Sequence, residues 1–202
     1  MESITHRAAR GSGKPLRFLR SRKTTLIFIL FFIGGVAFGS IYAVAGGNGS
    51  LLVSIVLNDL EIQAGRNLQQ IFLKSVVQNV GILLYLYFCS NCSKGKPLIH
   101  MVPLFFGLSV GAVITAVLYK LSIAALPYVL ACVALPKFIQ ALLLISACNN
   151  ALKISAQLFK DPGDWRRTEG SCIHMGLYGG AFLLFSFLES IILIFFRHLL
   201  PL

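Results

Sequence analysis

Residues 24–45 read TTLIFILFFIGGVAFGSIYAVA and contain no charged side chain. A helix of this run, rising about 1.5 Å per residue, is long enough to cross the ~30 Å hydrocarbon core of a bilayer. Four further apolar runs follow, at residues 73–90, 101–119, 123–148 and 172–196. Because open strands cannot cross lipid with unpaired backbone groups, these runs predict five transmembrane helices.

The composition agrees with a membrane protein. The 202-residue chain is 56% hydrophobic and 12% charged, with a mean hydropathy of +0.80, whereas a soluble domain has about 25% charged residues. This balance excludes an ordinary soluble enzyme, a disordered protein and a disulfide-rich secreted domain. We therefore predict an all-α, polytopic membrane bundle with a basic cytoplasmic tail, residues 1–23, and one transmembrane domain, residues 24–202.

The net charge of +11 predicts the orientation of the chain. With the N-terminus inside and the C-terminus outside, thirteen basic residues fall on the cytoplasmic side and four on the outer side, as the positive-inside rule requires. A four-span alternative, with residues 123–148 re-entrant, would worsen this distribution. A second alternative is a signal peptide cleaved after Ala43-Val44-Ala45, but the apolar run exceeds the ~7–15 residues of a typical signal sequence.

The first outer loop, residues 46–72, is the longest segment outside the predicted spans. At its end, Leu68, Ile71, Phe72 and Val76 share one face of a helix. This amphipathic pattern predicts an interfacial helix that lies on the membrane surface and leads into the second span.

Ionisable residues are scarce inside the spans. Lys137 follows Pro136 in the fourth span, close to Gln140, and Glu189 is the only acidic residue within the spans. A charged lysine in the membrane costs at least ~2.5–3.5 kcal/mol, and helical rise places Glu189 about one turn from its level. We therefore predict an intramembrane pair that fixes the fourth span against the fifth, with a proton or ion relay as the alternative. Asn79 adds a polar group to the second span, where it is predicted to hydrogen-bond between helices.

Glycine pairs four residues apart occur in three spans. They are Gly35 and Gly39, Gly107 and Gly111, and Gly176 and Gly180. Such spacing lets helix backbones approach closely. We favour packing inside one bundle over the alternative, a face for a homo-oligomer.

No catalytic, cofactor-binding or metal-binding motif is recognisable. The Cys89-x-x-Cys92 spacing has no second pair, so free thiols in a reducing compartment are favoured. The basic tail is predicted to attract anionic lipids, at ~1 kcal/mol per basic residue near the surface. It shows no aromatic or fold signal for nucleic-acid binding.

Across residues 20–196 the chain resembles the stage II sporulation protein M family. Six features carry the resemblance in order: FFIGGVAFG (31–39), QIFLKS (70–75), Asn79, FGLSVG (106–111), LPKFIQ (135–140) and Glu189. Family members often have a His-Gly pair after the proline, where this chain has Lys137 and Phe138.

The resemblance implies a non-enzymatic scaffold in the cell membrane of an endospore-forming bacterium. Such a protein would act in engulfment, localising the peptidoglycan-degrading stage II sporulation proteins D and P at the septal membrane. Residues 46–74 would then be the contact surface for partners that act on the wall. The rival function is a small transporter or permease subunit with an intramembrane Lys/Glu site, since broken spans with charged residues form binding sites in some transporters.

Overall fold

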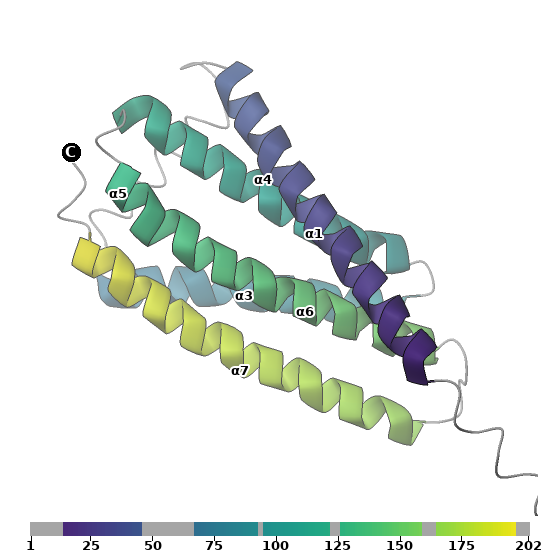
Figure 1. Ribbon diagram of the computed structural model, residues 1–202. Coiled ribbons are helices and arrows are strands. Elements are labelled where there is room, and N and C mark those ends of the chain that lie inside the picture. Colours follow the sequence, from purple (N-terminus) through teal and green to yellow (C-terminus); the bar gives the residue numbers. More distant parts are fainter. Residues whose placement is uncertain (1–13, 46–66, 93–94, 122–125, 159–164, 197–202) are drawn as a thin grey trace, which may run out of the picture.

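A computed structural model describes residues 14–45, 67–92, 95–121, 126–158 and 165–196. Within these ranges the chain is helical and has no strand. The helices are α1 (Lys14–Ala45), α3 (Leu68–Asn91), α4 (Gly95–Leu121), α5 (Leu126–Tyr128), α6 (Leu135–Leu158) and α7 (Trp165–Phe196), with a π-helical segment, η4 (Val129–Ala134), between α5 and α6. They form one elongated bundle, in which the end of α7 lies opposite the start of α1 (Figure 1).

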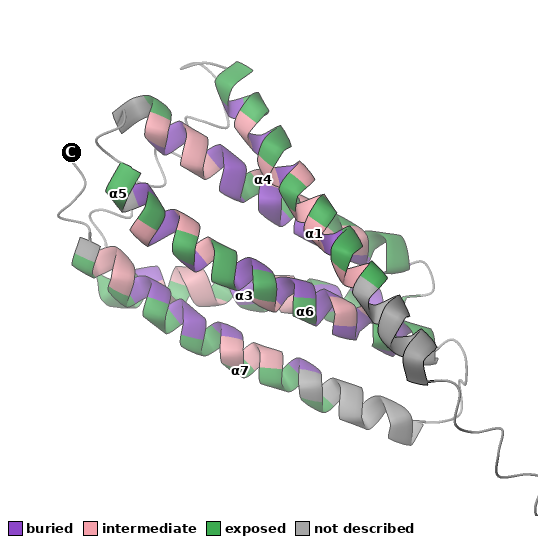
Figure 2. Ribbon diagram, viewed as in Figure 1, coloured by how far each residue is buried: buried purple, intermediate pink, exposed green. Residues whose placement is uncertain are grey.

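Five stretches of these helices are long and apolar enough to span a membrane, which confirms the predicted fold class. They are Lys23–Ala45, Leu68–Asn91, Gly95–Tyr119, Val129–Ala156 and Met175–Phe195. Many large apolar side chains, such as Leu30, Phe38 and Leu184, are exposed on the outer faces of the bundle (Figure 2). An apolar exterior of this kind suits a lipid surrounding and would be unfavourable in water.

Two helices differ in extent from the predicted segments. The helix of the fourth span does not end at residue 148, because α6 continues to Leu158 and carries Lys153 on its exposed side. The predicted interfacial helix is not a separate element either, because residues 68–76 are the first turns of α3. Ile71 is buried there and the ring of Phe72 packs edge-on against Phe187 of α7. The apolar face that suggested a membrane surface therefore binds another helix. The rest of the outer loop, residues 46–66, and tail residues 1–13 lie outside the described residues.

Helices α1 and α4 pack through the first two glycine pairs. A Cβ atom on Gly35 or Gly39 would collide with the backbone of α4, and one on Gly107 or Gly111 would collide with the backbone of α1. The two pairs are thus reciprocal, and each gives room to the other helix, as close packing in membranes requires. This confirms packing inside one bundle for these four residues.

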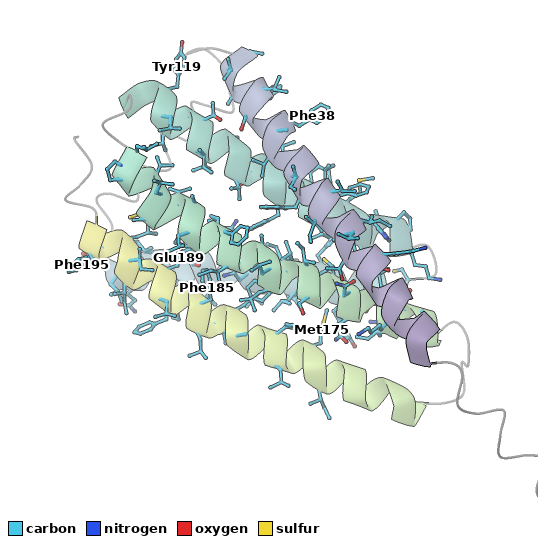
Figure 3. All side chains as sticks on the ribbon, in the orientation of Figure 1. Phe38, Tyr119, Met175, Phe185, Glu189 and Phe195 are labelled. Atoms are coloured by element: carbon cyan, nitrogen blue, oxygen red, sulfur yellow. The ribbon has the colours of Figure 1, made fainter. Side chains whose placement is uncertain are left out.

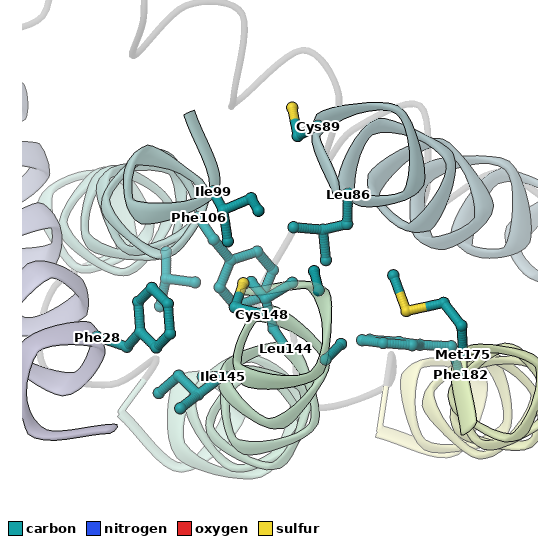
Figure 4. Close-up of a cluster of buried hydrophobic side chains, with 14 residues drawn as sticks. Phe28, Leu86, Cys89, Ile99, Phe106, Leu144, Ile145, Cys148, Met175 and Phe182 are labelled. Carbon is teal, nitrogen blue, oxygen red and sulfur yellow. The ribbon is translucent and has the colours of Figure 1, made fainter. Parts of the chain in front are cut away.

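Helix α6 lies at the centre and contacts α1, α3, α4 and α7. The main apolar cluster gathers around it, with Leu144 and Cys148 from α6, Phe28 from α1, Leu86 from α3 and Phe182 from α7 (Figure 4). Each of these side chains is at most 2% exposed. Because α6 is held on several sides, polar side chains on its inner faces meet side chains of the neighbouring helices.

Candidate functional site

The ion pair predicted between the fourth and fifth spans is present. The Lys137 Nζ atom in α6 lies 2.8 Å from Oε1 of Glu189 in α7. The Glu189 side chain is 6% exposed and that of Lys137 is 23% exposed, so the carboxylate is enclosed and the ammonium is partly open. Glu189 lies towards the middle of the bundle from α7 (Figure 3).

The second carboxylate oxygen of Glu189 is also occupied. The hydroxyl of Ser75 in α3 donates a hydrogen bond of 2.9 Å to Oε2. One carboxylate therefore binds α3 through one oxygen and α6 through the other. A buried charge that accepts two such bonds has much of its lost hydration replaced.

The contacts continue one turn further along each helix. Lys137 donates to Oε1 of Gln140 at 2.9 Å, and Nε2 of Gln140 donates to Oδ1 of Asn79. Asn79 donates through Nδ2 to the Ser186 hydroxyl at 2.7 Å, and that hydroxyl donates to the Phe182 carbonyl at 2.8 Å. We call the six side chains the polar network: Ser75, Asn79, Lys137, Gln140, Ser186 and Glu189.

Helical spacing explains why each helix contributes two members. Ser75 and Asn79 are four residues apart in α3, whereas Lys137 and Gln140, and Ser186 and Glu189, are three apart in α6 and α7. Residues at these separations share one helix face. Each helix therefore presents two polar side chains on one face, and the three polar faces meet at the same level of the bundle.

Pro136 and the π-helical segment set the start of α6. Pro136 is among the most buried residues and is the second residue of α6, where its missing N–H removes one backbone hydrogen bond at the junction with the preceding helical segment. The π segment η4 directly precedes it. Such segments add a residue to a turn, which rotates the following side chains by about 100° relative to an unbroken α-helix. Together, the π segment and Pro136 determine which helices Lys137 faces.

Apolar side chains pack against the polar network on the side that faces the end of α6 and the start of α7. Leu144 lies one turn beyond Gln140, Phe182 one turn before Ser186, and Leu86 about two turns beyond Asn79. All three side chains are fully or nearly fully buried in the same cluster. The next polar contacts of α6 are Ser146 with Tyr178 at 2.8 Å and Asn149 with Thr25 at 3.0 Å. In the described part of the chain, these leucine and phenylalanine side chains thus lie between the two sets of polar contacts.

Five predicted site residues come together and four lie elsewhere. The structure gathers Asn79, Pro136, Lys137, Gln140 and Glu189 in or beside the network. The four glycines of α1 and α4 form a separate contact, as described above. In α7, Gly176 and Gly180 meet no other atom within 4 Å of an added Cβ, so packing inside the bundle is the wrong interpretation for this third pair.

Two network members were not predicted as site residues, Ser75 and Ser186. Serine is common in transmembrane helices, so neither is distinctive alone. The available signal was their spacing, since Ser75 lies one turn from Asn79 and Ser186 one turn from Glu189 on the same helix faces. In the described part of the chain, no group of three His, Cys, Asp or Glu side chains could hold a metal ion.

No family model, no curated protein and no solved structure matches this chain.

Proposed function

We propose that this chain is a non-enzymatic membrane scaffold. The observation that supports it is the closed polar network: the one acid of the spans is bound by Lys137 and Ser75, and the amides of Gln140 and Asn79 bind each other. Groups that satisfy one another in this way hold α3, α6 and α7 in one register. A rigid bundle with little chain outside the membrane suits a protein that positions partners.

The proposal extends to partners through the resemblance to the stage II sporulation protein M family. The partners are peptidoglycan-degrading proteins of the stage II set, held at the septal membrane during engulfment. Their contact surface would be residues 46–74, which join α1 to α3. Asn67 and the start of α3 are the described part of this surface, and Leu68, Gln69 and Gln70 are exposed there.

The proposed orientation keeps the N-terminus inside. Lys23 near the start of the first span, Lys96 near the start of α4 and Lys153 near the end of α6 are all exposed. The helix order puts these positions at the same end of the bundle (Figure 1). Basic side chains collected at one end favour the cytoplasmic side, which leaves residues 46–74 facing the wall.

Affinity capture from sporulating cells tests the scaffold. A tagged chain in mild detergent is expected to retain wall hydrolases. A matched chain with residues 49–65 replaced by a Gly/Ser linker should accumulate normally and lose them. Recovery of equal hydrolase with both chains would place the contact elsewhere, and recovery with neither would overturn the proposed partners.

A transporter is the second candidate, favoured by one observation. Lys137 is 23% exposed beside a proline and a π-helical segment, and broken helices with polar groups form transporter sites. Gene deletion separates the two functions. The scaffold predicts normal vegetative growth with arrest at engulfment, whereas a transporter predicts a growth defect for one solute and normal spores.

A further inference from the structure

A wedge-shaped apolar groove lies between the α1–α4 pair and the η4–α6 segment. Its volume is about 630 Å³, within the range of about 300–1,000 Å³ that is usual for ligand-binding clefts. Ten apolar side chains line it: Phe32, Val36, Val110, Ile114, Pro127, Leu130, Ala131, Ala134, Leu135 and Phe138. We propose that this groove is a binding site for one acyl chain of a membrane lipid.

The first argument is the groove's depth. Along α5, η4 and α6 its wall extends from Pro127 to Phe138, which is at most roughly 17 Å at the α-helical rise of about 1.5 Å per residue. The facing walls are shorter and run from Phe32 to Val36 in α1 and from Val110 to Ile114 in α4. One leaflet of the hydrocarbon core is roughly 15 Å thick. The groove therefore begins at the end of the bundle where α5 lies and stops near the membrane midplane, as a single acyl chain does.

The second argument is the closed base. Beyond the groove, α1 meets α6 directly, where Asn149 donates a 3.0 Å hydrogen bond to Thr25 and Phe28 packs beside Ile145 (Figure 4). Towards the other end, α1 stays with α4 and diverges from α5 (Figure 1). A transmembrane helix from a second copy or another protein would need a surface that runs through both leaflets. The contact between α1 and α6 closes the groove before it reaches the second leaflet.

The third argument is chemistry. Water requires two to four polar partners to occupy a cavity, and every lining side chain is apolar. The flanks, Leu130, Leu135 and Phe138, are 57–59% exposed, so the groove opens to the surroundings of a spanning segment, which are hydrocarbon. Filling it restores the dispersion contacts that an empty groove forfeits.

Lipid retention tests the site. Ala131→Leu with Ala134→Leu fills the groove from the η4 wall, and Ala37→Leu adds the same group on the exposed side of α1. Native mass spectrometry follows each protein after purification with a phosphatidylglycerol and phosphatidylethanolamine mixture. We expect one retained lipid on the unchanged chain and the Ala37 variant. On the groove variant we expect about tenfold less, because the added side chains occupy the space in which the acyl chain makes its dispersion contacts. Equal retention by both variants would overturn the proposal.

A second measurement uses the unchanged chain and does not depend on a variant folding. In vesicles of the same two lipids, a photoreactive group near the end of one acyl chain should crosslink preferentially at the midplane end of the groove, to residues 32–36 and 134–138. Crosslinks spread evenly over the exposed faces of α1, α3 and α7 would refute the site. Dimers of the chain linked through the groove would show a second copy there, and would refute it equally.

Discussion

The carboxylate of Glu189 holds the ammonium of Lys137 at 2.8 Å inside the bundle, and its other oxygen accepts a bond from Ser75. The pair thus does not stand alone, since both partners also bind side chains that connect to a third helix. This arrangement makes the loss of one charge more costly than the loss of both. A buried ion whose partner is removed keeps its desolvation penalty, whereas two apolar substitutes have none.

The first prediction therefore concerns single and paired substitution. Lys137→Ala and Glu189→Ala should each cost about 3–5 kcal/mol and reduce accumulation in membranes. The pair Lys137→Met with Glu189→Leu should recover most of this loss, and the charge swap Lys137→Glu with Glu189→Lys should recover part of it. Thermal denaturation of the detergent-solubilised chain measures the effect.

Lys153→Gln is the matched control for this series, because it removes a lysine from the exposed side of the same helix. It should change stability by less than about 0.5 kcal/mol. If the paired variants were as unstable as the single ones, the contact between Lys137 and Glu189 would not be what stabilises the bundle.

The second prediction tests the hydrogen bonds that the side-chain amides of Asn79 and Gln140 make in the polar network. Asn79→Leu removes the acceptor of Gln140 and the donor to Ser186 together, and should cost roughly 1–2 kcal/mol, as interhelical hydrogen bonds in membranes do. Asn91→Ala, at the exposed end of the same helix, should be nearly neutral. Hydrogen exchange should rise in α3, α6 and α7 for the first variant. A rise confined to α3 would argue against a network shared by three helices.

The third prediction uses adjacent glycines of α1. A side chain on Gly35 would collide with the backbone of Leu104, whereas one on Gly34 meets nothing within 4 Å. Gly35→Leu should separate α1 from α4 and lower the melting temperature strongly, since backbone cannot yield as a flexible side chain can. Gly34→Leu should be tolerated. Similar melting temperatures for both variants would contradict the reciprocal glycine packing.

The accuracy of sequence-based prediction differed among these features for physical reasons. The five spans were predictable because lipid excludes charge, so uninterrupted apolar runs reveal them. The pairing of Lys137 with Glu189 was predictable because no other acid was available within the spans to offset the lysine. Neither inference needed a knowledge of the bundle's arrangement.

Features that depend on which helices meet were harder to predict. Asn149 and Asn150 end the apolar run of the fourth span, although α6 continues because their amides bond to Thr25 of α1 and Met175 of α7. The spacing of Gly176 and Gly180 matches that of Gly35 and Gly39, yet only the α1 pair faces another helix. The spacing of glycines identifies a helix face that lacks large side chains, but it does not identify the helix that packs against that face.

The last prediction concerns the orientation of the chain. Cys92 is exposed at the junction between α3 and α4, whereas Cys89, Cys132 and Cys148 are buried. In a chain that carries Cys172→Ser, a membrane-impermeant maleimide should therefore label Cys92 when added to inside-out vesicles and not when added to intact protoplasts. A cysteine introduced by Ser50→Cys, with Cys92→Ser to remove the first site, should show the opposite pattern. Labelling of Cys92 from outside would invert the topology, and it would move residues 46–74 away from the wall and exclude them as the contact surface for wall hydrolases.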